Sequence, residues 1–457
     1  MMPEEHNRVI TFGCRLNAYE SKAIEAALSK SEQQNLIVFN SCAVTQQAER
    51  DLRASIRKTR RENPRAKIVV TGCAAQIDPQ KYAKMAEVDL VLGNQEKSSS
   101  ESYSTLSSAS QVKVVRQEIK KAVIDDIAHK DRIFSAAKKS SQIFLEPHES
   151  SKIKVNDIMS LRETAPQLVS YFENQTRAFL EIQNGCNHRC TFCIIPFGRG
   201  NSRSVAFGEI VAQVKKMVAA GHKEVVLTGV DISGYGEDLP SSLKLSAMIK
   251  RLLALVPELL RLRLSSIDVA EMDEGFFELL RSEPRFMPYF HLSLQSGDDM
   301  ILKRMKRRHN RAQILEFCAK ARQISPEVTF GADIIAGFPT EDEAMFENSL
   351  RLIAEAGIIF THIFPYSKRD GTPAAKMPQL DGKVIKQRAK LLREAGSAQL
   401  QKFLQQQVGK NFEVLFEKNG SGKTKNFLDV KISGKKPEAG EVLEIKALGV
   451  EGNFLIS

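Results

Sequence analysis

Six of the seven cysteines in this chain of 457 residues fall into two groups of three. The first group, Cys186, Cys190 and Cys193, forms the pattern CxxxCxxC, and we call these the central cysteines. Thiolates grouped in threes are natural ligands of an iron–sulfur cluster. A four-iron cluster held by three thiolates leaves one iron open to a small molecule. The pattern therefore predicts a cluster that does chemistry rather than one that only stores electrons.

The same loop has a second interpretation, a structural zinc site with a fourth ligand elsewhere. Structural zinc sites usually take pairs of cysteines from two loops, and no second CxxC pair occurs in this chain. The spacing therefore favours the cluster over zinc. The seventh cysteine, Cys318, lies in the helical pattern Gln313–Arg322 and is interpreted as a small buried apolar residue.

Composition is that of a globular protein, with 42% hydrophobic and 26% charged residues. The length predicts two or three domains. No apolar stretch is long enough to span a membrane, and the start of the chain lacks a signal-peptide pattern, so a cytoplasmic protein is expected. In that reducing compartment, grouped cysteines indicate metal ligands rather than disulfides.

The net charge of +11 favours an anionic partner, of which nucleic acid is the commonest. Basic residues gather in two stretches, at 50–65 and at 303–311. Each stretch alone is equally well explained as the solvated face of a helix.

The first ninety or so residues alternate between short strands and helices, which indicates a small parallel sheet. The expected helices include Ala18–Leu28 and Ala48–Arg61, and the expected strands are Arg8–Phe12, Leu36–Phe39, Lys67–Val70 and Val88–Leu92. The second cysteine group, which we call the amino-terminal cysteines, comprises Cys14, Cys42 and Cys73. Each follows one of the first three strands. Because ligands gather at the carboxyl ends of parallel strands, we expect these three thiols at one edge of the sheet.

The residues 96–175 are interpreted as a linker between domains. Its opening, Lys97–Ser104, is of low complexity and is expected to be flexible, and a helix is possible at Gln117–Ala128. Domain boundaries are accordingly predicted at 1–95 for the amino-terminal domain and 96–175 for the linker.

A second alternation of strands and helices predicts a partial or full (β/α) barrel at 176–400, with its active site at the carboxyl ends of the strands. The six expected strands are Ala178–Ile182, Glu224–Thr228, Arg261–Ser266, Pro288–Leu294, Thr329–Ile335 and Thr361–Tyr366. The central cysteines directly follow the first of them. Short strands separated by turns at 419–422 and 433–436 then predict a small β-barrel at 405–457.

CxxxCxxC after the first strand of a barrel resembles the radical S-adenosylmethionine enzymes. In that superfamily the open iron binds the amino and carboxylate groups of S-adenosylmethionine, whose reductive cleavage yields a 5′-deoxyadenosyl radical that abstracts hydrogen. Longer phrases resemble, more narrowly, the methylthiotransferases: FGCRLNAYES at 12–21, NSCAVT at 40–45, TGCAAQ at 71–76 and GCNHRCTFCIIP at 185–196. These motifs occur in the same order over nearly the whole chain except the linker.

The resemblance implies a flavodoxin-like amino-terminal domain, a radical S-adenosylmethionine barrel and a terminal TRAM-like barrel. It implies two 4Fe-4S clusters, one on the central cysteines and an auxiliary one on the amino-terminal cysteines, together with S-adenosylmethionine. It also implies tRNA as a partner, held by the TRAM-like region in tRNA-modifying members. That region has nearly as many acids as lysines here, so a barrel that only packs against the catalytic domain stays possible.

Members of the family differ in substrate: a prenylated adenosine in tRNA, a threonylcarbamoylated adenosine in tRNA, or an aspartate of a ribosomal protein. NSCAVT at 40–45, TGVDI at 228–232 and FPYSKRDGTPAA at 364–375 are most similar to the threonylcarbamoyladenosine type. The expected activity is therefore methylthiolation of that base beside the anticodon. The rivals are the other two substrates and, from another class, a non-enzymatic iron–sulfur carrier or RNA-binding module.

Further residues are expected at the S-adenosylmethionine site by the same resemblance and by their place near strand ends. They are Phe192, Thr228, Gly229, Val230, Ser266, Ser293, Gln295 and Asp333. For each polar residue alone, hydrogen bonding in a turn or cap is an equal alternative. The expected protein is a monomer without membrane association, and it needs an external electron donor and a sulfur source.

Overall fold

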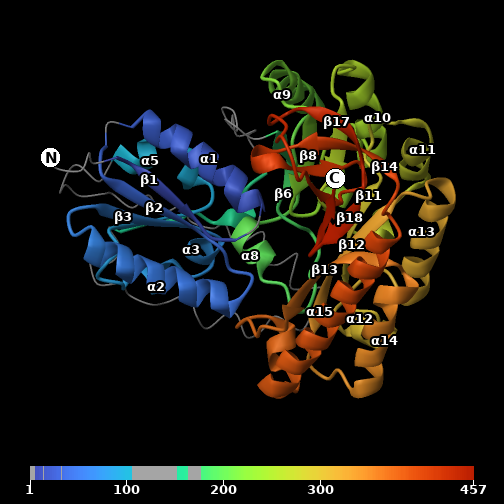
Figure 1. Ribbon diagram of the computed structural model, residues 1–457. Coiled ribbons are helices and arrows are strands. Elements are labelled where there is room, and N and C mark those ends of the chain that lie inside the picture. Colours follow the sequence, from blue (N-terminus) through green and yellow to red (C-terminus); the bar gives the residue numbers. More distant parts are fainter. Residues whose placement is uncertain (1–5, 14, 32, 105–151, 163–175) are drawn as a thin grey trace.

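The computed structural model describes residues 6–13, 15–31, 33–104, 152–162 and 176–457, which form three parts along the chain (Figure 1). A parallel sheet with flanking helices comes first, a barrel follows, and a small sheet ends the chain. Cys14 and the helix expected at Gln117–Ala128 lie outside the described residues.

The amino-terminal sheet is entirely parallel. Its strands are β1 (Arg8–Thr11), β2 (Leu36–Ser41), β3 (Lys67–Gly72), β4 (Leu90–Leu92) and β5 (Ile153–Lys154), in that spatial order. Helices α1 (Arg15–Ser29) and α2 (Gln46–Glu62) pack on opposite faces, because alternate residues of β2 contact each helix (Figure 1). The predicted α/β class is confirmed. The order 1-2-3-4-5 differs from the 2-1-3-4-5 order of a flavodoxin-like sheet.

Two described segments of the predicted linker, 96–104 and 153–154, belong to this sheet domain. Residues 96–104 form η1 (Glu96–Ser98) and α5 (Glu101–Ser104), and β5 pairs with β4. The flexible opening predicted at Lys97–Ser104 is wrong, because Lys97 and Tyr103 are fully buried. The Lys97 ammonium lies 2.8 Å from the Glu20 carboxylate, and Tyr103 donates a hydrogen bond to the Lys97 carbonyl. The polar, serine-rich sequence of this segment gave no indication that Lys97 forms a buried ion pair.

The barrel is incomplete and has six parallel β-segments, which confirms the six predicted strands. They are β6 (Arg177–Asn184), β8 (Glu224–Gly229), β9 with β10 (Arg261–Leu264, Ser266–Ile267), β11 (Tyr289–Gln295), β12 (Thr329–Ala336) and β13 (Ile358–Pro365). A short β7 (Arg203–Ser204) pairs antiparallel with β6. The strands β6, β8 and β9 form one half of the barrel, and β10 to β13 form the other. An isolated parallel bridge from Leu262 of β9 to Phe286, which precedes β11, links the two halves.

Helices cover the outside of the barrel (Figure 1). They are α9 (Phe207–Ala219), α10 (Leu245–Leu255), α11 (Glu274–Ser282), α12 (Asp299–Arg304), α13 (Arg311–Ile324), α14 (Glu343–Glu355) and α15 (Gly382–Gln405). The short helix α8 (Ile195–Arg199) lies instead between the barrel and the amino-terminal domain (Figure 1). Short turns of 3-10 helix lie at η4 (Ile158–Ser160), η5 (Ile232–Gly234), η6 (Val269–Glu271) and η7 (Pro373–Lys376). No helix among the described residues has the length and apolar character needed to cross a membrane.

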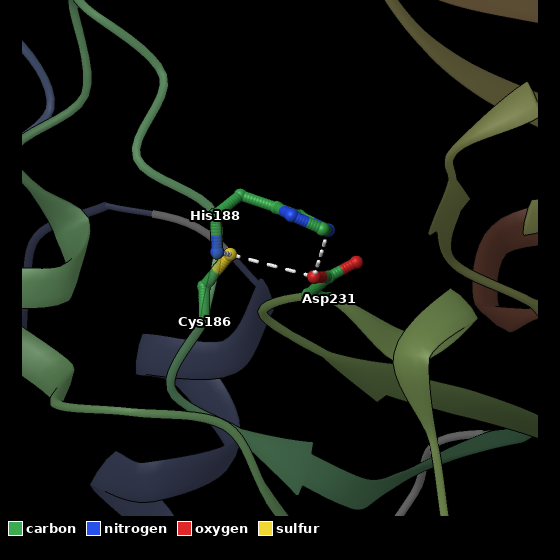
Figure 2. A group of neighbouring side chains, drawn as sticks. All are labelled: Cys186, His188 and Asp231. Atoms are coloured by element: carbon green, nitrogen blue, oxygen red, sulfur yellow. Dashed lines mark hydrogen bonds and ion pairs between the residues drawn. The ribbon is translucent and has the colours of Figure 1, made fainter. Parts of the chain in front are cut away.

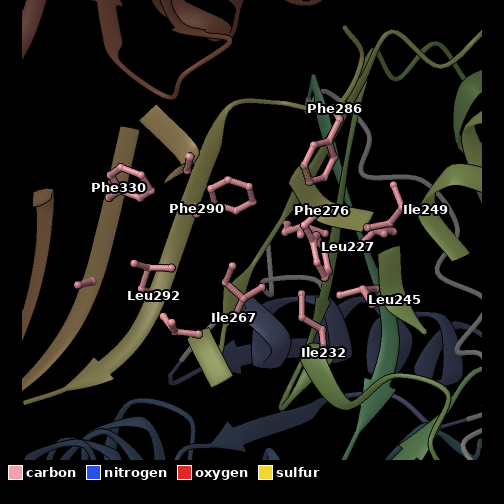
Figure 3. Close-up of a cluster of buried hydrophobic side chains, with 14 of the residues drawn as sticks. Leu227, Ile232, Leu245, Ile249, Ile267, Phe276, Phe286, Phe290, Leu292 and Phe330 are labelled. Carbon is pink, nitrogen blue, oxygen red and sulfur yellow. The ribbon is translucent and has the colours of Figure 1, made fainter. Parts of the chain in front are cut away.

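The largest core lies between the barrel strands and these helices. Figure 3 shows Leu227 of β8 beside Leu245 and Ile249 of α10, with Phe290 and Leu292 of β11 further along the same layer. Burying each such side chain contributes about 1.5–3 kcal/mol relative to exposure. Cys318 of α13 is fully buried in this core, which confirms its interpretation as an apolar residue.

The carboxy-terminal sheet is mostly antiparallel, with one parallel pair, β16 and β19. Its strands are β14 (Asn411–Phe416), β15 (Ser421–Thr424), β16 (Asp429–Lys431), β17 (Val442–Lys446), β18 (Gly449–Glu451) and β19 (Phe454–Ile456). It packs at the amino ends of the barrel strands. There the Phe427 ring stacks on Tyr289, the first residue of β11, with ring centroids 4.5 Å apart, and Arg261 pairs with Glu413 at 2.9 Å. This sheet therefore closes the end of the barrel opposite the predicted active site.

Candidate functional site

The central cysteines lie on a loop at the carboxyl end of β6. Gly185 turns the chain into the loop with φ of 75°, and a Cβ there would lie 1.9 Å from the Asn201 carbonyl oxygen, so only glycine fits. Thr191 is anchored on two sides: its N–H donates to the Met305 carbonyl at 3.1 Å, and its own carbonyl accepts from the Ala374 N–H at 2.9 Å. The loop is thus fixed over the mouth of the barrel.

These thiols have the surroundings of cluster ligands. Cys186 Sγ accepts the His188 backbone N–H at 3.4 Å, and Cys190 Sγ accepts from the Arg307 guanidinium at 3.6 Å. Burial raises the pKa of the Cys193 thiol to about 12, so it stays protonated unless a cation replaces the proton. None of the three forms a disulfide. Unpaired thiols supplied with N–H donors fit an iron–sulfur cluster, whose potential is tuned by such bonds.

A mixed group of side chains adjoins Cys186 (Figure 2). Cys186 Sγ lies 3.4 Å from Asp231 Oδ2, and His188 Nε2 lies 2.9 Å from the same oxygen. The carboxylates of Asp231 and Glu271 raise the pKa of His188 to about 10. One atom each from Cys186, His188 and Asp231 lies within 4.8 Å of the others, which is the arrangement that a zinc ion would use. The zinc alternative therefore has a concrete ligand set to test.

Two of the amino-terminal cysteines lie at the predicted sheet edge. Cys42 follows Ser41 at the end of β2, and Cys73 follows Gly72 at the end of β3. Ser41 and Gly72 are partners in the strand register, so the two cysteines leave adjacent strands side by side. Both are buried, and neither is in a disulfide. The place of Cys14 lies outside the described residues.

The sulfurs of this pair also receive N–H donors. Cys42 Sγ accepts from the Val44 backbone at 3.5 Å, and Cys73 Sγ accepts from the Asn94 amide at 3.9 Å. Gly13 packs so closely that a Cβ would lie 2.7 Å from Cys42 Cβ, at a φ of 119°. The chain next to Cys14 is therefore directed against Cys42.

The two cysteine groups are brought together by α8, which starts two residues after Cys193. A Cβ at Gly198 of α8 would lie 3.2 Å from Cys73 Cβ, and the Gly198 carbonyl accepts from the Asn94 amide at 2.6 Å. The next residue, Arg199, forms a two-pronged ion pair with Glu20 of α1, at 2.8 and 3.0 Å. Both charged groups are buried. The segments that carry the two cysteine groups therefore form one packed unit.

One cavity is lined both by Cys193 and by the segment that follows Cys42, and we call it the reaction cavity. It has a volume of about 210 Å³ and lies at the carboxyl ends of β11, β12 and β13. Phe192 and Cys193 line it from the central loop, and Val44 and Thr45, which follow Cys42, line it from the amino-terminal domain. A molecule in this cavity would touch segments of both cysteine groups.

The residues expected at the S-adenosylmethionine site divide into two sets. Phe192, Gln295 and Asp333 line the reaction cavity. The others are not among its lining residues: Thr228, Gly229, Val230, Ser266 and Ser293. Thr228 is buried, whereas Ser266 is exposed at the barrel mouth.

A buried glutamine, Gln183 of β6, explains the place of one of these segments. Its side-chain oxygen accepts the backbone N–H groups of Val230 and Asp231, at 3.1 and 2.8 Å. A Cβ at Gly229 would lie 2.5 Å from the Gln183 carbonyl oxygen, so glycine permits this close approach. Gln183 was not expected at the site from sequence, and it holds the end of β8 against the central loop.

The expected residue Asp333 belongs to a group of side chains inside the barrel whose other members were not expected from the sequence. Asp333 Oδ1 lies 2.9 Å from His291 Nε2 and 3.3 Å from His362 Nδ1, and His291 Nδ1 lies 2.8 Å from the Tyr289 hydroxyl. Burial alone would raise the pKa of Asp333, but the two histidines outweigh it and lower the pKa to about 2. Asp333 therefore presents a carboxylate, not a carboxylic acid, to the cavity.

Arg307 is the third residue that sequence analysis missed. Besides Cys190, it reaches the Asp268 carboxylate at 3.0 Å and the Ser293 carbonyl at 2.7 Å. His309 lies 3.2 Å from the same carboxylate. The only signal in the sequence was the basic stretch 303–311, whose residues turn out to be in part buried ion-pair partners.

Two family descriptions match the chain. Residues 180–353 match the Radical SAM superfamily, and residues 6–93 match the Uncharacterized protein family UPF0004. Among solved structures, a cobalamin-bound radical S-adenosylmethionine methyltransferase, TsrM from Kitasatospora setae, aligns over 82% of this chain and 74% of its own, with a TM-score of 0.52. At 13% identity, that likeness shows the fold alone.

Curated relatives align over nearly the whole chain. The threonylcarbamoyladenosine tRNA methylthiotransferase MtaB of Rickettsia prowazekii is 50% identical over 98% of this chain and 96% of its own length. The protein of the same name from Aquifex aeolicus is 35% identical over 95% and 98%. A tRNA-2-methylthio-N(6)-dimethylallyladenosine synthase from Cereibacter sphaeroides is 29% identical over 97% and 96%. The chain therefore belongs to the threonylcarbamoyladenosine tRNA methylthiotransferase family of radical S-adenosylmethionine enzymes.

Proposed function

We propose that this protein replaces the hydrogen on carbon 2 of a threonylcarbamoylated adenosine, beside the anticodon of tRNA, with a methylthio group. The observation that carries the proposal is the reaction cavity, because Cys193 and the segment after Cys42 line the same space. A reaction that joins hydrogen abstraction to sulfur transfer needs both cysteine groups within reach of one substrate atom.

In this proposal, the central cysteines hold one 4Fe-4S cluster with S-adenosylmethionine, and the amino-terminal cysteines hold the other. The residues present fit these groups, since none of the described thiols is in a disulfide and four sulfurs accept N–H donors. When bound, the first group supplies a radical able to abstract hydrogen, and the second a sulfur that can be methylated and transferred.

The chain's own residues would bind and orient the base. Phe192, Ile335 and Phe364 give the cavity an apolar wall that keeps water from a reactive centre. Asp333, ionised and held by two histidines, is an acceptor for an N–H or hydroxyl group of a ligand. Gln295 has φ of 70°, a rare conformation outside glycine that marks a position over-determined by its surroundings.

The remaining parts of the proposal concern partners. We expect a monomer that acts in the cytoplasm, takes electrons from an external donor and draws on an external sulfur source. The net charge of +11 supports binding to the tRNA phosphates, and affinity should then fall with salt. A base in the unpaired anticodon loop can be splayed into the barrel mouth.

The activity is tested by mass spectrometry of tRNA nucleosides from a strain that lacks this enzyme, with and without re-expression. Return of the methylthio group on threonylcarbamoyladenosine supports the proposal. Its return on a prenylated adenosine, or on a ribosomal peptide, would refute the choice of substrate.

The cofactors are tested by anaerobic reconstitution followed by iron and sulfide counts. We expect about eight irons in the wild type and about four in each of two variants, one lacking the central and one lacking the amino-terminal cysteines. Cys318→Ala is the matched control, because this thiol is buried in the core. Zinc in place of iron, bound at Cys186, His188 and Asp231, would contradict the assignment.

A further inference from the structure

A second cavity adjoins the reaction cavity and differs from it in chemistry. It has a volume of about 310 Å³ and lies between α2, the α3–α4 segment (Cys73–Ile77, Pro79–Ala83) and the loop after β13. We call it the charged cleft. Five cations and three acids line it: Arg50, Arg53, Lys81, Lys368 and Arg369, with Glu49, Asp78 and Asp370. The excess of cations predicts an anionic occupant.

One acid, Glu49, forms ion pairs with all three inner cations. Glu49 lies 2.6 Å from Lys81 and 3.8 Å from Arg53, and it also forms an ion pair with Arg369. Burial alone would raise the pKa of Glu49, but the hydrogen bonds from Lys81 and Arg369 lower it. Glu49 is therefore an anion built into the wall, and it fixes these cations in place.

The outer cations have no such partner. Arg50 and Lys368 are exposed, and no ion pair is found for either of them within the described part of the chain. Arg50 donates only to the side chain of Gln46, at 3.3 Å. Two cations from different segments of the cleft lining are thus available to a ligand.

A buried hydroxyl gives a second, independent sign of a ligand. Tyr82 is fully buried and lines the cleft, yet its hydroxyl has no hydrogen-bond partner among the described residues. Burial raises the pKa of Tyr82 well above its ordinary value, so the group is a neutral donor. A buried hydroxyl left unpaired costs free energy, and an acceptor bound in the cleft would recover it.

The charged cleft lies directly beside the reaction cavity. Ile194 lines both, and the chain passes from one to the other twice, at Thr45–Gln46 and at Ser367–Lys368. The two crossings are tied together, since the Gln46 N–H donates to the Ser367 hydroxyl at 3.1 Å and the Gln46 amide to the Lys368 carbonyl at 3.0 Å. The two cavities are therefore close enough for one ligand with a side group to contact both linings.

We propose that the charged cleft binds the free carboxylate of the threonylcarbamoyl group, and that Arg50, Lys368 and Tyr82 select this substrate. The inference rests on the proposed function. The threonylcarbamoyl group ends in a carboxylate and a hydroxyl, which match two cations and a phenol donor. A prenyl group is apolar and would leave all three unsatisfied, which costs affinity.

The test measures binding of an anticodon stem–loop RNA to the reconstituted enzyme in three forms. One carries threonylcarbamoyladenosine, one carries the same group with its carboxylate converted to a carboxamide, and one carries plain adenosine. We expect the wild type to prefer the carboxylate over the carboxamide by about tenfold. Arg50→Gln combined with Lys368→Gln should abolish that preference, and Tyr82→Phe should reduce it.

The matched control is Arg61→Gln, which removes an exposed cation from the last turn of the same helix, outside the cleft. It should keep the full preference. If the double variant weakens all three RNAs equally, the cleft holds a backbone phosphate and the proposal is overturned. It is also overturned if the wild type binds carboxylate and carboxamide alike.

Failure of the proposed function has a different signature. In that case the wild type forms no methylthio derivative of threonylcarbamoyladenosine in cellular tRNA, whatever the stem–loops show. A normal iron content shows that the double variant is folded. Tyr82→Phe, a smaller change, tests the same cleft independently. A preference that survives in all variants of normal iron content refutes the role of these residues.

Discussion

The buried ion pair between Arg199 and Glu20 gives the sharpest prediction on how the two cysteine groups are held together. Arg199 lies in α8 and Glu20 in α1, so the pair joins the barrel loop to the amino-terminal domain. Both side chains are at most 3% exposed. Burial alone would raise the pKa of Glu20, but Arg199 and then Lys97 outweigh it and lower the pKa to about 2. The carboxylate is therefore charged and depends on its partners.

Replacing Arg199 by methionine should cost about 3 kcal/mol in the free energy of opening this interface. Breaking one side of a buried pair costs roughly 3–5 kcal/mol. The lower end applies because Lys97, 2.8 Å from Glu20, remains as a counter-ion. Since each 1.4 kcal/mol is tenfold in an equilibrium constant, about 3 kcal/mol corresponds to roughly a hundredfold.

Hydrogen exchange read by mass spectrometry measures this opening locally, without assuming two-state unfolding of a multidomain chain. Amides of α1 and α8 should exchange about a hundredfold faster in R199M, while those of α13 are unchanged. The control combines R199M with E20Q and K97M, which removes all three charges of the buried group and should restore most of the protection. Exchange within threefold of wild type in the single variant, or no recovery in the triple variant, would refute the reasoning.

Three further predictions concern other parts of the molecule. Phe427→Ala should lower the free energy of unfolding by about 3–5 kcal/mol, because the ring fills the closed end of the barrel against Tyr289. Urea denaturation should show this loss, with iron content unchanged. A loss below about 1 kcal/mol would contradict the prediction. Burial and the nearby Glu20 carboxylate raise the pKa of Glu181 from 4.5 to about 7. The stability that Glu181 contributes should therefore be complete below pH 4.5 and lost as the pH rises towards 7. In Glu181→Gln, the free energy of unfolding should decrease less over this pH range. Cys318→Ser should lower the free energy of unfolding by about 1–3 kcal/mol, because it buries a hydroxyl in the apolar core. The iron count should equal that of the wild type, and a lower count would refute the structural role of Cys318.

Sequence reasoning succeeded where one rule of chain geometry decided the outcome. Cys42 and Cys73 were expected at one sheet edge because each follows a strand, and the register of β2 with β3 brings them side by side. The central cysteines were expected over the barrel mouth for the same reason, and Cys193 lines the reaction cavity. Both predictions rest on cysteine spacing and on the positions of strand ends, which can be inferred without knowing how side chains pack.

Residues that act through partners distant in sequence were missed. Lys97 looked like part of a flexible serine-rich segment, yet it is buried because Glu20, 77 positions earlier, compensates its charge. Arg307 looked like one cation among several, although Asp268 and Cys190 fix its place. Such pairs cannot be recognised from the neighbouring sequence, since lysine and arginine are most often found on the protein surface.

One signal was present in the sequence and was not used. In β11, the polar residues Tyr289, His291, Ser293 and Gln295 alternate with large apolar residues. A strand of a parallel barrel is usually apolar on both faces, so strict alternation indicates that one face lines a polar space. Three of these four make side-chain or backbone contacts at the barrel interior or line the reaction cavity. The alternation would have pointed to His291.

The two ends of the barrel satisfy their polar residues in different ways, and this difference sets where the substrate enters. At the amino ends, Arg263 pairs with the buried Glu224 at 2.9 Å and donates to the Lys425 carbonyl, so the carboxy-terminal sheet completes the hydrogen bonds there. Beside the carboxyl ends, the charged cleft between the amino-terminal domain and the loop after β13 leaves Arg50 and Lys368 without an ion pair, and the Tyr82 hydroxyl without a hydrogen bond, among the described residues. Because the amino end of the barrel is closed by the chain itself, the proposed function requires RNA to present its base from the side of the cysteines. Any contact of that RNA with the terminal sheet then has to run around the outside of the barrel rather than through it.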